Sequence, residues 1–290
     1  MLIYILSRGA NLYSTTRLYQ AAFAKKHNVR IIDHMHCDLL IEDGIYKVIF
    51  NGEVLIRPDA VIARIGSSNT YYGTTVVKHF EEMKVPVYNT SKGILASRDK
   101  FRSMQILAAS KIRIPKTYFS YDLHQAERII AQKFNYPVIA KLIEGTQGAG
   151  VYLLNNQIEA NNAFNKFISD NTKVLLQEFI AEFKGKDIRA FVIGGKVVAA
   201  MMRIAEGDEF RSNLHRGGRG EKIVLSEEEK EMAVRSVKAL GLKIGGVDIL
   251  RSKKGSMVIE VNSSPGLEGI EAVTEIAVAD KIITYIEEHI

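Results

Sequence analysis

The first ninety or so residues alternate short apolar runs with stretches of helical periodicity, and this alternation constrains the fold more than any other feature. The runs LIYIL, VRIID, DAVIARI and VPVYN are typical of buried strands, and residues 14–28 and 71–84 between them are typical of helices. YKVIF and EVLI flank Asn51-Gly52, a pair that favours a tight hairpin. Strands that alternate with helices predict a mainly parallel sheet.

The rest of the chain predicts further α/β units around separate cores. Residues 91–110 have helical spacing, and a turn at Pro115 leads into a region with helices at 126–134 and 159–169 and strands at 136–143, 150–154 and 173–180. A hairpin over 189–205, a helix over 227–241, two apolar strands and a closing helix from about Thr274 follow. We therefore expect three packed units, 1–95, 96–187 and 188–290.

The bulk composition sets limits on function. The chain has 290 residues, is 47% hydrophobic and 25% charged, and carries a net charge of +6, which favours anionic partners. Cys37 is the only cysteine, so an intrachain disulfide is excluded and a reducing cytoplasm is expected. No apolar run is long enough to cross a membrane, and no RNA-binding signature or arginine-rich tail predicts direct nucleic-acid readout.

Three oxygen-bearing side chains lie on the two apolar strands near the C-terminus. GGVDIL carries Asp248, and VIEVN carries Glu260 and Asn262, with the short polar connection RSKKGS between them. Side-chain alternation places Val258, Glu260 and Asn262 on one face, and a hairpin would bring Asp248 beside them. Hard oxygen ligands of this kind suit Mg²⁺ shared with nucleotide phosphates. The alternative is that Asn262 caps the turn and each carboxylate meets a lysine.

A glycine loop follows a lysine in AKLIEGTQGAGV. Lys141 lies on a strand, and Gly145, Gly148 and Gly150 allow backbone amides to approach a phosphate closely. The loop is not a Walker A motif or a dinucleotide fingerprint. The glycine loop alone would predict a plain hairpin turn. Because it occurs with Lys141 and with the three distant oxygen ligands, phosphate binding is the more specific interpretation.

Two polar segments add candidate substrate contacts. LLQEFIAEFKGKDIR ends a strand in Glu178, Phe179 and Ile180, which offer backbone groups to an adenine edge, and Asp187 follows as an acceptor for ribose hydroxyls. An exposed hinge is the alternative. RIAEGDEFRSNLHRGGRG is an arginine-rich loop whose guanidinium groups match phosphate and carboxylate; it holds Asn213 and His215 together with four arginines, Arg203, Arg211, Arg216 and Arg219. A lone histidine in such a loop is more often not catalytic.

In order, the chain shows Asp99-Lys100, PKT at 115–117, Lys141 with its glycine loop, QEFI, Asp187, EFRSNLHRGG, GVDIL and EVNSSPGLEGIE. This order resembles the ATP-grasp carboxylate–amine ligases. The motifs KLIEGTQGAGV, EFRSNLHRGG and EVNSSPGLEGIE are similar to those of the RimK branch, and the resemblance covers nearly the whole chain. The resemblance implies a mixed α/β (α+β) ATP-grasp fold with an N-terminal parallel-sheet unit, a central lid and a C-terminal catalytic unit.

The resemblance also implies roles for individual residues. ATP would contact Lys100, Lys141, Gly145, Gly148, Gly150, Glu178, Phe179, Ile180, Asp187, Arg211, Ser212 and Asn213. Two Mg²⁺ or Mn²⁺ ions would bind Asp248, Glu260 and Asn262. Arg203, Arg211 and Asn213 would act in catalysis, and His215, Arg216 and Arg219 would contact substrate.

The implied reaction is the ATP-dependent addition of glutamate, through an acyl-phosphate, to the C-terminal carboxylate of a small-subunit ribosomal protein, by a homo-oligomer that is a tetramer in many relatives. One alternative is a sister ligase that acts on an amino-group carrier protein or a cofactor tail. A non-catalytic ribosome-binding protein would explain the charge but not the oxygen ligands. A kinase would stop at phosphoryl transfer, and its His-Arg-Asp and Asp-Phe-Gly motifs are not found.

Overall fold

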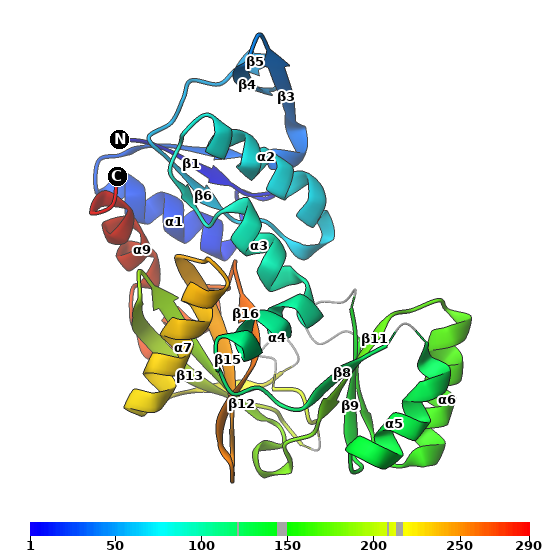
Figure 1. Ribbon diagram of the computed structural model, residues 1–290. Helices are drawn as coiled ribbons and strands as arrows, with labels where there is room; N and C mark the ends of the chain where they lie inside the picture. The colour runs from blue at the N-terminus through cyan, green and yellow to red at the C-terminus, as the bar shows by residue number, and fades with distance from the viewer. Residues whose placement is uncertain (121, 144–149, 208, 213–216) are drawn as a thin grey trace.

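The computed structural model describes residues 1–120, 122–143, 150–207, 209–212 and 217–290, arranged around four sheets (Figure 1). The N-terminal sheet has the order β2-β1-β6-β7, and each of its pairs is parallel, as predicted. Its strands are β1 (Leu2–Leu6), β2 (Asn28–Ile32), β6 (Ala60–Ala63) and β7 (Val87–Tyr88), and its helices are α1 (Tyr13–Ala24) and α2 (Thr70–Glu82).

A small antiparallel sheet extends from this unit. It consists of β3 (Cys37–Glu42), β4 (Ile45–Phe50) and β5 (Glu53–Val54). The predicted turn at Asn51-Gly52 is confirmed, with φ of 53° and 81°. A second turn at Asp43-Gly44, with φ of 51° and 76°, pairs β3 with β4 and was not predicted. Asp-Gly favours the same left-handed conformations as Asn-Gly, so the signal was present in the sequence.

The central sheet has the order β10-β9-β11-β8 and is antiparallel. It is formed by β8 (Thr117–Phe119), β9 (Val138–Leu142), β10 (Val151–Leu154) and β11 (Val174–Glu178), with α5 (Ala126–Lys133) and α6 (Gln157–Ser169) packed on one face. Figure 1 shows this lobe standing to one side of the rest of the molecule.

Two helices connect the N-terminal sheet to the central lobe where one was predicted. α3 (Ser91–Arg98) ends at Asp99, and α4 (Lys100–Ala109) begins directly after it. Asp99 has extended backbone angles, and its carboxylate accepts a hydrogen bond of 2.9 Å from the Arg102 backbone N–H. The prediction of an unbroken helix was wrong because Asp99 acts as an N-cap.

The C-terminal sheet has the order β14-β13-β12-β15-β16. Its strands are β12 (Lys186–Ile193), β13 (Lys196–Ile204), β14 (Arg219–Lys222), β15 (Ile244–Ser252) and β16 (Gly255–Asn262). α7 (Glu227–Ala239) covers one face, and α8 (Glu268–Thr274) and α9 (Val278–Glu287) pack on the other. The closing helix predicted from about Thr274 is α9, which begins at Val278. α8 was not predicted; it ends at Thr274, because Glu275 adopts a left-handed conformation.

Four short 3₁₀ helices complete the described elements: His34–His36, Ser67–Asn69, Leu123–Gln125 and Ala181–Phe183. No helix within the described ranges has the length and apolar character needed to span a membrane. The division at residues 95/96 and 187/188 stays a prediction, and β12 begins at Lys186, just before the second of these boundaries.

The N-terminal and C-terminal sheets share one hydrophobic core. Ile3, Ile5 and Ile62 of the first sheet belong to the same cluster of buried side chains as Phe191 and Ile283. Asn89 adds a polar connection, because its side chain donates to the carbonyls of Ile244 (2.7 Å) and Ser263 (2.9 Å) and accepts from the N–H groups of Lys243 and Ile244. Every hydrogen-bonding position of the Asn89 amide is thereby used, as a buried amide requires. These contacts fix the end of β16 against the end of β7.

Candidate active site

A row of charged residues crosses one face of the C-terminal sheet. Arg189 on β12 is the register partner of Asp248 on β15, which is in turn the partner of Glu260 on β16. Asp187 lies on the same face of β12 two residues before Arg189, opposite Arg203 on β13. The predicted hairpin is confirmed, and it brings Asp248 and Glu260 side by side. The connection between its strands is only Lys253-Lys254, shorter than the predicted RSKKGS.

The prediction that Val258 shares a face with Glu260 was wrong. The register shifts between Asp248 and Ile249, so that Ile249 pairs with Val258 and Ile259 is an extra residue on β16. Such a bulge interrupts the alternation of side chains. Val258 therefore packs with Val261 in the core under α7, whereas Glu260 is exposed on the other face. The bulge allows β16 to pack Val258 and Val261 in the core and to present a carboxylate between them.

Asp248 is a buried carboxylate held by two guanidinium groups. Arg189 binds both of its oxygens, with an Nη2–Oδ2 distance of 2.8 Å, and Arg203 Nη2 lies 2.8 Å from Oδ2. Burial alone would raise the pKa of Asp248, but the two arginines outweigh it and hold the pKa below its usual range. Asp248 is therefore ionised. The alternative of a lysine partner is not what is found, since both partners are arginines.

Arg203 occupies a different place from the one predicted. It was expected in or beside a basic loop, but it lies within β13 and is buried, with its Nε 2.5 Å and Nη2 2.7 Å from the two oxygens of Asp187. Burial alone would lower the pKa of Arg203. The carboxylates of Asp248 and Asp187 outweigh this effect, so the pKa of Arg203 is raised. A guanidinium that is desolvated between two carboxylates orders the site and does not gather substrate from solution.

Glu260 and Asn262 differ from Asp248 in their surroundings. Glu260 is exposed, and no cation in the described ranges lies within salt-bridge distance of it. Asn262 Oδ1 accepts the Ser264 N–H at 2.9 Å, so the alternative that Asn262 caps the turn also holds. Asp248, Glu260 and Asn262 together offer two carboxylates and an amide oxygen, the donor set preferred by Mg²⁺ and Mn²⁺. These residues fit a divalent cation next to a phosphate chain.

Two lysines face the carboxylates from other elements. Lys141 extends from β9 of the central sheet, and Lys100 begins α4, where its Nζ donates to the Ile143 carbonyl at 2.8 Å. Burial lowers the pKa of each lysine, and Glu260 is the first carboxylate that offsets this effect for both. Asp248 and Asp187 also act on Lys141. The structure therefore brings the lysines and the three carboxylates of the predicted site together.

The predicted adenine and ribose contacts lie at the junction of the central and C-terminal sheets. Glu178 ends β11, and its Oε2 accepts the Lys116 N–H at 3.2 Å; Ile180 is buried and Phe179 partly so. A hollow of about 260 Å³ lies near this hinge, between Lys184–Lys186 and Glu209. Asp187 is buried and bound by Arg203. Its assignment to ribose stays a prediction.

The arginine-rich segment contacts the central lobe. Arg211 binds Glu209 through Nε (2.9 Å) and Nη2 (2.7 Å), lies over the Phe210 ring and reaches the Val151 carbonyl on β10. The pKa of Glu209 is lowered to about 2, chiefly by the hydrogen bond from Arg211. Ser212 is buried beside it, and Gly150 adopts a left-handed conformation before β10. Glu209 thus holds the guanidinium fork that was predicted to bind phosphate.

Other predicted residues are placed away from this cluster or are not described. Arg219 lies on β14, exposed, with Glu221 as its ion-pair partner at 3.1 Å. The remaining predicted residues lie outside the described part of the chain: Gly145, Gly148, Asn213, His215 and Arg216. Their roles stay predictions.

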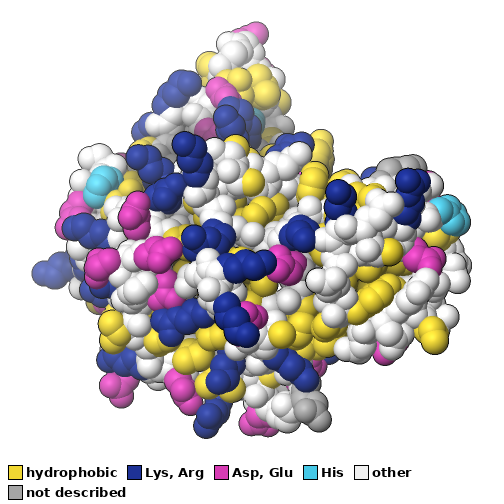
Figure 2. Space-filling model, turned by 60° about the horizontal axis from the view of Figure 1, so that its bottom comes forward, with side chains coloured by type: hydrophobic (Ala, Val, Ile, Leu, Met, Phe, Trp, Pro, Cys, Tyr) yellow, Lys and Arg dark blue, Asp and Glu magenta, His cyan; other side chains and the backbone are white. Residues whose placement is uncertain are grey.

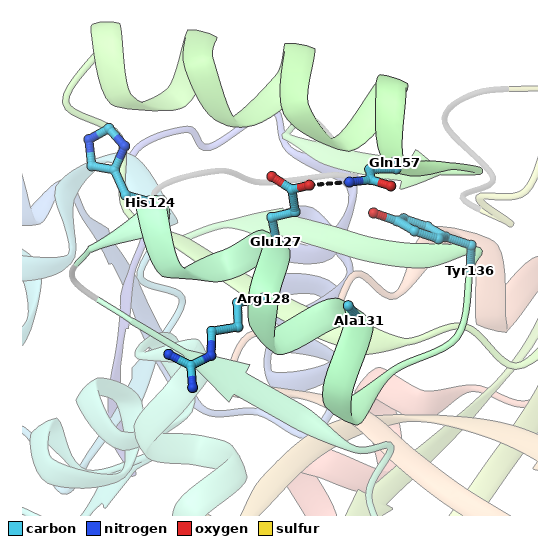
Figure 3. A pocket seen from close by; sticks show the side chains of 6 residues that line it. All are labelled: His124, Glu127, Arg128, Ala131, Tyr136 and Gln157. Carbon is cyan, nitrogen blue, oxygen red and sulfur yellow. Dashed lines mark hydrogen bonds between the residues drawn. The ribbon is translucent and has the colours of Figure 1, made fainter.

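A separate pocket of about 310 Å³ lies on the helical layer of the central lobe (Figure 3). It is lined by His124, Glu127, Arg128, Ala131, Tyr136 and Gln157. Figure 3 shows Glu127 turned toward the Gln157 amide, to which it is hydrogen-bonded, and Arg128 turned away from both. The pocket has none of the carboxylate and lysine pairs described above, so it is not the candidate active site.

Sequence reasoning missed Arg189, Arg98 and Glu209. Arg189 was quoted only as part of a strand, yet it binds Asp248 on the neighbouring strand. Its position two residues after Asp187 in DIR was the available signal, because the two residues then share a face. Glu209 binds Arg211 only two residues away, so the sequence EFR was the available signal for it. Arg98 is brought to the site only by tertiary contacts, for which a single sequence has no signal.

The antiparallel central sheet, the C-terminal sheet and the lysines and carboxylates between them define the ATP-grasp class. Solved structures support the fold. A precursor-bound structure of the ATP-grasp ligase PsnB has a TM-score of 0.78 at 19% identity, covering 99% of this chain and 97% of that one. A RimK domain protein from Sphaerobacter thermophilus has a TM-score of 0.72 at 18% identity, covering 99% and 100%.

The sequence comparisons are more specific. A model described as RimK PreATP-grasp domain matches residues 1–94, and one described as RimK-like ATP-grasp domain matches residues 97–286. Relatives named "Probable alpha-L-glutamate ligase" from Picosynechococcus sp. and Vibrio vulnificus are 49% and 48% identical, each covering 100% of this chain and 96% of the relative. The chain belongs to the RimK-like ATP-grasp family and is an ATP-dependent ligase. Enzymes of this class use ATP with Mg²⁺, and one PsnB structure holds Mg and ADP.

Proposed function

We propose that this ligase joins glutamate, through an acyl-phosphate, to the C-terminal carboxylate of a small-subunit ribosomal protein. The observation that supports this most is the convergence of Asp248 and Glu260 with Lys100 and Lys141, which provides a site for a metal-bound triphosphate beside open solvent. The full-length relatives named as probable alpha-L-glutamate ligases supply the identity of the amine.

The reaction has two steps. The acceptor carboxylate attacks the γ-phosphoryl group of ATP, which gives an acyl-phosphate and ADP, and the α-amine of glutamate then displaces phosphate to form the amide. One anion must approach another in the first step, so the barrier is mainly electrostatic. Two Mg²⁺ or Mn²⁺ ions held by Asp248, Glu260 and Asn262 would neutralise the phosphate charge.

The protein's own residues complete the site. Lys100 and Lys141 bind phosphate oxygens. Arg211 releases Glu209 and binds the transferred phosphoryl group instead. The ribose and adenine lie at Asp187 and at Glu178 to Ile180. Asn213 supports Arg211, and the glycines at 145, 148 and 150 close over phosphate. Figure 2 shows Lys and Arg side chains running from the upper part of the view through its centre to the bottom, with acidic ones interspersed. Basic side chains attract an acidic acceptor, and in this proposal His215, Arg216 and Arg219 contact it.

The family resemblance supports a cytoplasmic homo-oligomer. The three-unit division 1–95, 96–187 and 188–290 is retained in this proposal, because the two matched family regions meet at residues 94–97.

The test is mass spectrometry of ribosomal small-subunit proteins incubated with the enzyme, ATP, Mg²⁺ and isotopically labelled glutamate. We expect one subunit protein to gain labelled glutamate at its C-terminus. A synthetic peptide with that C-terminus should be extended, and the same peptide with an amidated end should not, because the reacting carboxylate is gone. Extension of the amidated peptide, or preferred use of lysine or aminoadipate, would replace this proposal by the sister ligase.

A further inference from the structure

Two arginines lie where the carboxyl end of the N-terminal sheet meets the charged row. Arg64 directly follows β6, and Arg98 ends α3. Three hydrogen bonds hold the surrounding segments together: Arg64 N–H to the Leu6 carbonyl (2.9 Å), Arg98 Nη2 to the Ile65 carbonyl (2.6 Å), and Ser264 Oγ to the Ala63 carbonyl (3.4 Å). The last of these connects β6 to the turn that follows Asn262. Both arginines therefore border the predicted metal site from the side opposite the central lobe.

The hydrogen-bonding capacity of these two side chains is largely unused. Arg98 Nε is buried and has no partner in the described part of the chain. For the Arg64 guanidinium, no hydrogen bond or ion pair to a described residue is found, although its side chain is half-buried. Ser263 Oγ, in the same turn as Ser264, is also buried without a described partner. Buried donors without acceptors are costly, so they indicate a ligand that supplies oxygen atoms.

The charges around the pair also require an anion. Burial, and after it the neighbouring Arg98, lowers the pKa of Arg64 to about 10. Burial likewise lowers the pKa of Arg98, and Glu260 is the carboxylate that offsets this. Glu260 also acts on Lys100 and Lys141, so one carboxylate faces three cations from three elements, and Arg64 has no carboxylate among the described residues that offsets its burial. A cation bound at Glu260 would leave Arg64 and Arg98 with still less negative charge nearby.

We infer that Arg64 and Arg98 form a carboxylate-binding subsite, which holds a substrate carboxylate that does not itself react, next to the phosphate and metal positions. A guanidinium fork binds a carboxylate through two parallel N–H···O bonds, and two forks around one carboxylate would use the donors left over here. This inference rests on the proposed function, which supplies two sources of such a group: a carboxylate of the incoming glutamate, or an acidic side chain near the acceptor terminus.

The test replaces Arg64 by lysine, which keeps the charge and removes the fork, and by methionine, which removes both. Arg57→Lys is the matched control, because Arg57 precedes the same strand at its other end and is exposed, with its guanidinium on the carbonyls of Met83 and Lys84. The Michaelis constants for glutamate, acceptor peptide and ATP are measured for each variant. Thermal melting with and without ADP shows that the variants fold and bind nucleotide.

We expect Arg64→Lys to raise the Michaelis constant for one carboxylate substrate at least about tenfold and Arg64→Met to raise it further, with the constant for ATP unchanged. The substrate affected identifies the source of the carboxylate. The inference is overturned if the Michaelis constants for glutamate and for the peptide stay within about twofold of those of the Arg57→Lys control in both variants.

A binding measurement separates this inference from the proposed function. Failure of the wild-type enzyme to join glutamate to any ribosomal protein would remove the proposed function alone. Calorimetric titration of the ADP-bound wild type and of Arg64→Lys with glutamate and with a short acidic peptide then tests the subsite directly for both sources. Binding of either ligand that is at least about tenfold weaker in the variant supports the subsite. Equal binding of both ligands by the two proteins, or no binding of either by the wild type, refutes it.

Discussion

Two clusters of buried carboxylates and arginines differ in what they connect. Glu271 on α8 accepts the Tyr13 hydroxyl (3.1 Å), Arg17 Nε (3.1 Å) and the Ala279 N–H (2.9 Å), and so fastens α1 to the C-terminal helices. Asp248 and Asp187 bind Arg189 and Arg203 within one sheet.

The first cluster joins elements that are distant in sequence and includes an uncharged hydroxyl and a backbone N–H. The second joins neighbouring strands that are already hydrogen-bonded, so the sheet does not need it for cohesion. It also continues into the exposed carboxylate of Glu260 and into two desolvated lysines. A network of buried ion pairs that lies within one sheet and continues into an exposed carboxylate therefore indicates a binding site more than a structural contact.

The largest expected effect comes from Glu260→Gln. The side chain is exposed and packs against no core, so the free energy of unfolding should change by less than about 0.5 kcal/mol. ADP release in the presence of acceptor should fall by at least about 100-fold, because a metal ligand is lost. A steady-state assay over a range of Mg²⁺ concentrations checks this. Full activity at low Mg²⁺ would remove Glu260 from the site.

A smaller effect is expected at the arginine-rich segment. Arg211→Ala should lower kcat by about tenfold or more with little change in folding, because its guanidinium is placed to meet the transferred phosphoryl group. Arg219→Ala is the matched control, since Arg219 is exposed and pairs only weakly with Glu221 on the same strand. Initial rates at saturating ATP, glutamate and acceptor compare kcat in the two variants, so that an acceptor contact of Arg219 changes only a Michaelis constant. Equal kcat values would mean that Arg211 has no role in phosphoryl transfer.

The structural cluster should respond in the opposite way. Glu271→Gln leaves Arg17 with the half-exposed Asp280 as its one carboxylate partner among the described residues, so the free energy of unfolding should fall by about 1–3 kcal/mol. Denaturant titration measures this, and the activity of the folded enzyme should stay within about twofold of wild type. If activity fell as far as in Glu260→Gln with no loss of stability, the distinction between the clusters would fail.

The smallest effect concerns the stability of the fold at acid pH. Glu229 caps α7 and binds Arg251, and the hydrogen bond from Arg251 is the main reason that its pKa is lowered to about 2. A depressed carboxylate pKa stabilises the fold above its unfolded value of about 4.3, and this contribution is lost as the pH falls toward 2. Arg251 is partly exposed, so the contribution is about 1–2 kcal/mol after screening. Glu229→Gln should flatten the loss of stability between about pH 5 and 2, as measured by urea titration. An unchanged slope would contradict this assignment.

Local patterns were enough to predict most strands and the carboxylate hairpin. Alternation of apolar runs predicted the parallel N-terminal sheet, and the Gly194-Gly195 pair and the polar connection RSKKGS located the long hairpins. The errors came from single residues that act through geometry: Asp99 caps a new helix, Glu275 ends another, and the bulge at Ile259 changes the face that Val258 presents. None of these changes the hydrophobic pattern on which the predictions were based.

The site was predictable where its residues lie in motifs and not where tertiary contacts supply them. Asp248, Glu260 and Lys141 follow from strand patterns and spacing. Arg64 and Arg98 reach the site only because Asn89 and the shared core fix the N-terminal sheet against β16, and that contact joins residues more than 150 positions apart. Arg203 was expected in or beside a loop because the segment that follows Ala205 is polar, whereas pairing with Asp187 places it within β13, which ends at Ile204.

The central claim is that the open end of the charged row binds a divalent cation with nucleotide. Electron paramagnetic resonance of Mn²⁺ titrated into the ADP-bound protein tests it without any turnover. Wild type and Glu271→Gln should bind Mn²⁺ equally, and Glu260→Gln should leave most of the Mn²⁺ in solution. If Glu260→Gln bound Mn²⁺ as tightly as the wild type does, the account would be contradicted.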